Sequence, residues 1–361
     1  MKLSVRSWLV VASFAVSVVL GVVLARGGAA PAASRRAQRP LIGLSLDTLK
    51  EERWQHDRDA FVARAKEDGA DILVQAANSD DTRQMQDVQA LISRRVGALI
   101  IAPHNGAAMA RAVALAHDAG IPVISYDRLI TGAPVDLYVA FDAVLVGEQQ
   151  ARGLMALLKD KPGTIRLVRI QGAKTDHNSF LVKEGQDKVL APFVKSGRVK
   201  VLLEDWADDW KPENAKKIMN AALTRFGHGL DAVLAANDGT AGGAIQALSE
   251  EGLAGKVAVA GQDAELVACQ RIAAGTQTLT IYKPVAQEAD AAVDAALRMM
   301  GGRAVVVRDS IGTGKDAVPA IMLQPIAVTS ANLLTTVVKD GYHSYDDVYR
   351  GLPAAERPPR P

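Results

Sequence analysis

Cysteine is almost absent from this chain, and this scarcity excludes intrachain disulfide bonds and cysteine-based metal sites. The single cysteine, Cys269, can form neither an intrachain disulfide nor a cysteine-based zinc site. It lies in a stretch with amphipathic helical spacing, so we interpret it as a small buried apolar residue. The chain also lacks a strong charge of either sign, because 42 basic residues nearly balance 40 acidic ones. We therefore expect no nucleic-acid partner, which would need a basic surface.

Catalytic and cofactor motifs are missing as well. The six histidines have no metal-ligand spacing, and no H-E-x-x-H motif is present. The sequence contains no G-x-S-x-G nucleophile elbow and no G-x-G-x-x-G dinucleotide fingerprint. We therefore expect that the protein is not an enzyme and that it uses no cofactor and no metal.

The N-terminal residues have the pattern of an export signal. Two cations, Lys2 and Arg6, precede an apolar run, and an A-x-A cleavage signal ends at Ala32. We predict a signal peptide over residues 1–32, followed by a basic linker over 33–40, and thus an exported protein. The apolar run borders on transmembrane length, so an uncleaved signal that anchors the protein in a membrane is the alternative.

From Leu41 onward, short β-rich runs alternate with amphipathic helical stretches in two successive sets. This alternation predicts an α/β fold with two doubly wound parallel-sheet lobes, because parallel strands need crossover helices. The tail from Tyr342 should be loosely ordered. Strands are expected at 41–46, 71–76, 98–102, within 121–129, and at 164–170, 199–204, 231–236, 257–261, 278–282 and 320–323. Helices are expected at 53–68, 82–94, 106–119, 144–159, 180–196, 212–226, 240–251 and 285–300.

The stretch Ile121–Leu129, with the sequence IPVISYDRL, begins as a buried strand and ends in the opposite charges Asp127 and Arg128. In open α/β sheets, ligands bind beyond the carboxyl ends of the strands. Taken alone, the pair could equally be a local ion pair in a solvated loop. Other strand ends, however, carry the same kinds of residue. They are Asp47, Arg53, Trp54, Asp176, Asn178, Trp206, Trp210, Asn237, Asp238, Gln262, Asp263 and Lys283.

These side chains share one chemistry. Carboxylates accept hydrogen bonds from hydroxyl groups, arginine and lysine donate to hydroxyl oxygens, and asparagine does both. Flat tryptophan faces suit the C–H faces of a sugar ring. Aromatic residues are only 4% of the chain, and three of its four tryptophans stand in these loops. The set therefore indicates a site for a polyol.

Several long stretches resemble periplasmic sugar-binding proteins of the ribose/galactose/xylose class, and most closely the xylose-binding members. The resemblance runs from about Leu41 to about Tyr342. It rests on EERWQHDRDAFV, ISYDRLI, LDAVLAANDGTAGGAIQALSEEGL, GQDAEL and RIAAGTQTLTIYKP. It implies a type I periplasmic binding protein, with two lobes joined by a three-strand hinge and the sugar buried between them. The N-terminal lobe would comprise 41–143 plus 285–319, the C-terminal lobe 144–284 plus 320–341, and the tail 342–361.

The resemblance also implies the residues that contact the sugar, with two tryptophans enclosing its ring. Within the loop QGAKTDHNS, His177 stands where the family pattern leads us to expect asparagine, a departure that bears on selectivity more than on sugar class. The implied contacts are Arg53, Trp54, Asp127, Arg128, Asp176, Asn178, Trp210, Asn237, Asp263 and Lys283.

The implied function is capture of D-xylose or a similar pentose in the periplasm and its delivery to the permease of an ABC transporter with its ATPase. The alternative is a monosaccharide-sensing module that presents its closed form to a chemoreceptor or sensor kinase. We expect a monomer in either case. A transcription regulator with this lobe architecture would need an N-terminal helix-turn-helix, and this chain has an export signal there instead.

Overall fold

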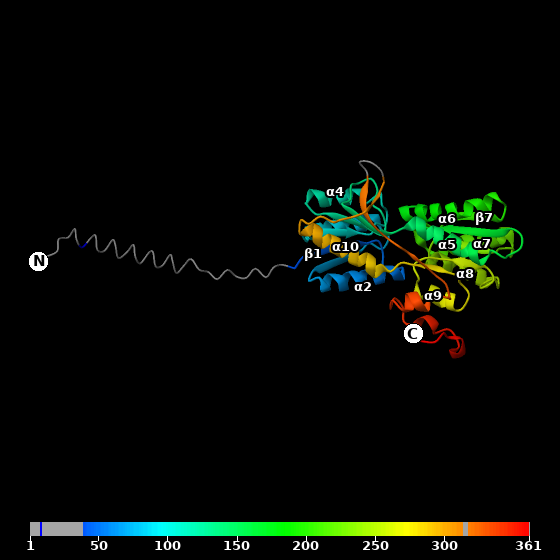
Figure 1. The fold of residues 1–361 in the computed structure, drawn as a ribbon. Helices are drawn as coiled ribbons and strands as arrows, with labels where there is room; N and C mark the ends of the chain where they lie inside the picture. Colours follow the sequence, from blue (N-terminus) through cyan, green and yellow to red (C-terminus); the bar gives the residue numbers. More distant parts are fainter. Residues whose placement is uncertain (1–7, 9–38, 313–316, 361) are drawn as a thin grey trace. The chain divides into compact units, whose positions relative to one another are not determined.

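A computed structural model describes residues 39–312 and 317–360, together with Trp8, and has an α/β fold (Figure 1). The predicted signal peptide and linker therefore lie outside the described residues, except for Trp8, Arg39 and Pro40. Within the described part of the chain, no helix combines the length and the apolar character that crossing a membrane would require.

The N-terminal lobe is built on a seven-stranded sheet in the order β11-β12-β5-β4-β3-β1-β2. All neighbours are parallel except β11 and β12. Its central strands read as continuous apolar runs because helices cover both faces. The strands are β1 (Leu41–Leu46), β2 (Asp71–Ala76), β3 (Ala98–Ile101), β4 (Val123–Tyr126), β5 (Leu137–Phe141), β11 (Asp309–Ile311) and β12 (Val318–Leu323).

Two pairs of helices enclose this sheet. Helices α2 (Glu52–Glu67) and α10 (Val285–Met300) lie together on one face and bury Trp54 and Phe61 (Figure 1). Helices α3 (Asp81–Ser93) and α4 (Ala110–Asp118) cover the other face. Helix α10 thus returns from the far end of the sequence to complete the first core.

The C-terminal lobe repeats this arrangement around four parallel strands in the order β7-β6-β8-β9. Helices α5 and α6 cover one face, and α7 and α8 cover the other. Strands β10 and β13 form an antiparallel pair, and a bridge from Leu279 to Ala260 links this pair to the sheet. The elements are α5 (Ala143–Leu157), β6 (Ile165–Gln171), α6 (His177–Lys195), β7 (Val199–Trp206), η1 (Asp208–Trp210), α7 (Pro212–Phe226), β8 (Ala232–Ala235), α8 (Asp238–Glu250), β9 (Ala258–Ala260), α9 (Leu266–Ala273), β10 (Thr280–Tyr282) and β13 (Ile326–Val328).

The chain passes between the lobes three times, after β5, after β10 and after β12. The predicted fold class, with its three-strand hinge, is confirmed. The predicted boundary at residue 320 is wrong, because β12 pairs with β5 from Ala320 to Leu323 and so extends the first sheet. After this last crossing, the segment that belongs to the second lobe begins at β13 and not at residue 320. The alternation of strands and helices also left β5 unpredicted, since no helix separates it from β4.

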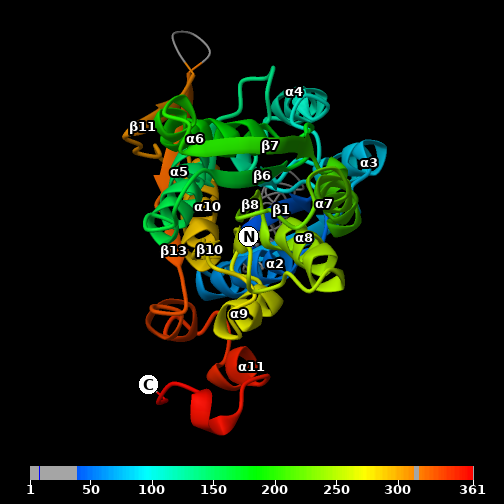
Figure 2. The ribbon, with the colours of Figure 1, turned by 90° about the vertical axis from the view of Figure 1, so that its right-hand side faces the viewer.

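The prediction of a loose tail is wrong as well. After the π-helical turn η3 (Leu334–Val338), helix α11 (Tyr345–Tyr349) packs against α9, and the short turn η4 (Ala354–Glu356) follows (Figure 2). Val348 and Tyr349 are buried in the same apolar cluster as Cys269. The C-terminal segment as far as Tyr349 therefore packs into an apolar cluster of the second lobe.

Replacing Tyr349 with alanine should lower the free energy of unfolding by about 2–4 kcal/mol, because the change removes a buried ring and leaves a cavity. Urea unfolding of the mature protein measures this loss. Arg350→Ala, at the neighbouring exposed position, is the control and should change stability by less than about 0.5 kcal/mol. Equal stability of the two variants would show that the tail does not contribute to the core.

Candidate functional site

The predicted site residues come together in one cavity between the lobes. The cavity contains about 530 Å³ of space, its opening to solvent included. All ten predicted residues line it. They are Arg53, Trp54, Asp127, Arg128, Asp176, Asn178, Trp210, Asn237, Asp263 and Lys283.

The turn after β4 places Asp127 and Arg128 at the cavity. Asp127 has a left-handed backbone, with φ of 55°, which a short polar side chain tolerates better than most. Its backbone carbonyl accepts a hydrogen bond from the Tyr138 hydroxyl at 2.8 Å. The Ser125 hydroxyl donates to the Arg128 carbonyl at 2.6 Å. These bonds hold the acid and the base so that both reach the same cavity.

Arg53, in the first turn of α2, is held by three carboxylates. Its Nη1 donates to Asp127 at 2.6 Å, its Nε donates to Asp57 at 2.9 Å, and Nη2 lies 3.4 Å from Glu288. A second bond from Nη2 to Asp57, at 3.1 Å, completes the set. A guanidinium has five N–H donors, so one N–H on Nη1 is left for a ligand.

Arg128 connects the two lobes. Its Nη1 donates to Asp47 at 2.7 Å in the first lobe, and its Nε lies 2.9 Å from Oδ2 of Asp176 in the second. Nη2 has no hydrogen-bond partner among the described residues. Arg128 therefore offers two fixed N–H donors to the cavity while its remaining donors are satisfied.

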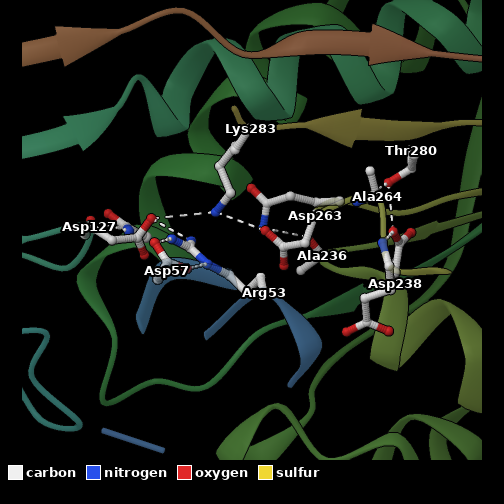
Figure 3. A network of polar contacts seen from close by, with 12 residues as sticks. Arg53, Asp57, Asp127, Ala236, Asp238, Asp263, Ala264, Thr280 and Lys283 are labelled. Atoms are coloured by element: carbon white, nitrogen blue, oxygen red, sulfur yellow. Dashed lines mark hydrogen bonds and ion pairs between the residues drawn. The ribbon is translucent and has the colours of Figure 1, made fainter. Parts of the chain in front are cut away.

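Lys283 lies at the second crossing between the lobes and stands between two carboxylates (Figure 3). Its Nζ is 2.8 Å from Asp263 and 3.4 Å from Asp127. Asp263, like Asp127, has a positive φ, in this case 95°. Such backbone strain is common at ligand sites, where the surrounding structure holds it in place.

Helix N-termini of the second lobe supply further polar groups. Asp176 is the N-cap of α6 and accepts from the backbone N–H of Asn178 at 2.9 Å. Asn178 in turn donates from Nδ2 to the carbonyl of Asp127 at 2.7 Å, across the cleft. Asn237 caps α8 through Oδ1, which accepts from Thr240. Capping occupies only Oδ1, so the Nδ2 amino group of Asn237 remains a donor for a ligand.

The two predicted tryptophans differ in their surroundings. Trp54 is almost fully buried, with the guanidinium carbon of Arg53 4.2 Å and that of Arg128 5.1 Å from its ring centroid. Trp210 lies flat against Gly172, where a Cβ atom would approach the ring to 2.2 Å. Its Nε1–H is buried and has no hydrogen-bond partner among the described residues. That these rings enclose a ligand stays a prediction.

Two polar cavity residues were not among the predicted contacts. Glu51 precedes α2, and burial raises the pKa of its carboxyl. Gln262 immediately precedes Asp263, and its side-chain amino group donates to the Ala236 carbonyl at 3.3 Å. This bond leaves the side-chain carbonyl oxygen of Gln262 as an acceptor. Its position at a strand end is a signal that could have identified it. Oε2 of Glu51 is buried and has no partner within the described part of the chain. The sequence gives no such signal for this residue.

The charges of the cavity largely satisfy one another. Burial acts to raise the pKa of Asp127, but Arg53 and Lys283 outweigh it and hold this pKa well below its usual range. Burial raises the pKa of Asp176, although Arg128 opposes the shift. Because cations and carboxylates are already paired, the cavity suits a neutral ligand with many hydroxyl groups. The donors and acceptors that remain are directed by fixed ion pairs.

A sequence model described as a periplasmic binding protein domain matches residues 42–304. The chain therefore belongs to the periplasmic binding protein family, as the sequence resemblance predicted.

Among its relatives, two are D-xylose-binding periplasmic proteins. The protein from Haemophilus influenzae is 44% identical over 308 residues, which cover 85% of this chain and 92% of the relative. The protein from Escherichia coli is also 44% identical, over 312 residues that cover 86% and 93%. A solved structure of a carbohydrate transporter solute-binding protein from Chloroflexus aurantiacus, in complex with D-glucose, is 31% identical. It aligns with a TM-score of 0.78 and covers 85% of this chain and 97% of its own.

Behind the cavity, a second pair of acids has raised pKa values. The carboxylate of Asp238 accepts from Thr280, Gln277 and the backbone N–H of Glu265 (Figure 3). Burial raises the pKa of Asp238 to about 7, although Arg271 opposes the shift. Burial, with the nearby charges of Asp238 and Asp263, raises the pKa of Glu265 to about 9.

These values predict that the protein loses stability as the pH rises from 6 to 9. A carboxyl with a higher pKa in the folded chain than in the unfolded one stabilises the fold at low pH. That stabilisation is lost as the pH rises through the folded value. Thermal unfolding midpoints should therefore fall over this range, and less so in Glu265→Gln. The exposed Glu250→Gln variant is the control and should follow the parent, while parallel profiles for parent and Glu265→Gln would contradict the assignment.

Proposed function

We propose that the protein captures D-xylose or a similar pentose between its two lobes and delivers it to the permease of an ABC transporter. The observation that carries this proposal is the cavity itself. Paired cations and carboxylates from both lobes line it, beside Trp54 and Trp210, and leave hydroxyl-directed donors and acceptors free. The names of the two 44% identical relatives support the choice of sugar. The same relatives support a periplasmic location after export.

Binding would need no chemistry on the sugar. The ligand reaches Arg53, Asp127 and Arg128 in one lobe and Asn237 and Asp263 in the other only when the lobes are together. It therefore favours the closed arrangement by a shift of population. Charge-assisted hydrogen bonds contribute about 1.5–3 kcal/mol each. The permease would then recognise the closed lobes, which present one continuous surface.

Replacing Arg128 or Asp263 with alanine should weaken D-xylose binding at least about tenfold, because each change removes a charge-assisted contact and leaves a buried partner unpaired. Isothermal titration calorimetry on the mature protein measures the effect. Arg152→Ala removes an exposed arginine that pairs with Glu148 and is the matched control. Unchanged affinity in both cavity variants would refute the assignment of the site.

D-Xylose should bind more tightly than D-glucose. The two differ by a hydroxymethyl group, and rings held between Trp54 and Trp210 leave little room for it. Competition calorimetry with both sugars tests this preference. Equal affinities would show that the two tryptophans do not restrict the ring substituent, although the protein would remain a sugar-binding protein.

A further inference from the structure

A second cluster of ligating side chains lies outside the sugar cavity. Glu52 and His56 are one turn apart on α2, and His343 reaches them from the segment that precedes α11. One ligand atom from each residue lies within 4.8 Å of the others, and Oε1 of Glu52 is 3.8 Å from Nε2 of His56. Among the described residues, this is the only such group of three.

Hydrogen bonds hold two of the three side chains and leave one ligand atom of each without a bond among the described residues. Nε2 of His343 lies 2.8 Å from the Ala264 carbonyl and donates to it, so the lone pair is on Nδ1. Oε2 of Glu52 accepts from the backbone N–H of Leu266 at 2.7 Å, which leaves Oε1 for a cation.

The ring geometry also fits. The centroids of His56 and His343 are 5.4 Å apart, with the rings edge to face. Two imidazoles on one zinc ion, each bonded at about 2.0–2.1 Å, would place their centroids about 5 Å apart. His56 is half-buried, and a shift of its ring toward Glu52 would close the remaining distance. We propose that Glu52, His56 and His343 form a binding site for a divalent transition-metal ion such as zinc, with water completing the coordination.

This site would connect the two lobes. Helix α2 belongs to the first lobe, whereas Ala264 and Leu266 pack in an apolar cluster of the second, and His343 donates to the Ala264 carbonyl. It also borders the segment that carries Asp263, since Tyr342 donates to the Asp263 carbonyl at 3.4 Å. A bound metal would therefore favour the arrangement in which the lobes meet. This step rests on the proposed function. We infer that a bound metal raises the affinity for the sugar, and by thermodynamic reciprocity a bound sugar raises the affinity for the metal.

Thermal unfolding of untagged mature protein with zinc chloride, without sugar, tests the site. Zinc should raise the midpoint by at least about 2 °C, and His56→Ala and His343→Ala should abolish the shift. His56 is half-exposed, so its variant remains informative if the buried His343 variant folds poorly. His228→Ala removes an exposed histidine beside Glu251 and should keep the full shift. No shift in the parent, or an equal shift in all variants, would overturn the site.

Titration of D-xylose with and without zinc then tests the coupling. Sugar should bind several-fold more tightly in the presence of zinc in the parent, and equally tightly in both conditions in His56→Ala. Sugar binding without zinc checks the proposed function separately, so its failure cannot be confused with failure of the metal site. Unchanged sugar affinity in the zinc-loaded parent would overturn the coupling.

Discussion

The carboxylate of Asp127 connects the parts on which the site depends. It accepts from Arg53 on α2 at 2.6 Å and lies 3.4 Å from Lys283, which follows β10. Three segments far apart in sequence therefore meet at one buried group. Burying such charges costs free energy that their attraction barely recovers, and an apolar replacement would often be more stable. Stability alone thus gives no reason for this network, whereas a ligand that needs fixed donors and acceptors does.

Pairing of the charges determines what remains for a ligand. Asp47 and Asp176 hold the Arg128 guanidinium on two sides, so the orientation of the two N–H groups on its Nη2 is fixed. Asn237 is fixed by its cap to Thr240 and keeps its amino group free. Because their own partners order these groups in the closed arrangement, a ligand held there would immobilise few further side chains. A neutral polyol gains directed hydrogen bonds there without having to neutralise any charge.

Much of this site could be predicted because parallel strands bring their carboxyl ends to one edge of a sheet. Asp127 follows β4 directly, Asn237 and Asp263 lie shortly after the ends of β8 and β9, and all three reach the cavity. The partner of β12 could not be predicted, since strand pairing is non-local and nothing in the run Val318–Leu323 specifies β5. The order of the tail likewise depends on α9, which buries Tyr349 from more than seventy residues away.

The segment that carries Asp263 is held from two sides by residues outside the cavity. The Asp238 carboxylate accepts a hydrogen bond from the backbone N–H of Glu265. The Thr280 hydroxyl accepts one from the backbone N–H of Ala264. From the other side, Tyr342 and His343 donate to the carbonyls of Asp263 and Ala264. Strained backbone persists only where its surroundings over-determine it, and the positive φ values of Asp263 and Ala264 meet that condition. The position of the Asp263 carboxylate in the cavity therefore depends on side chains that lie outside the cavity.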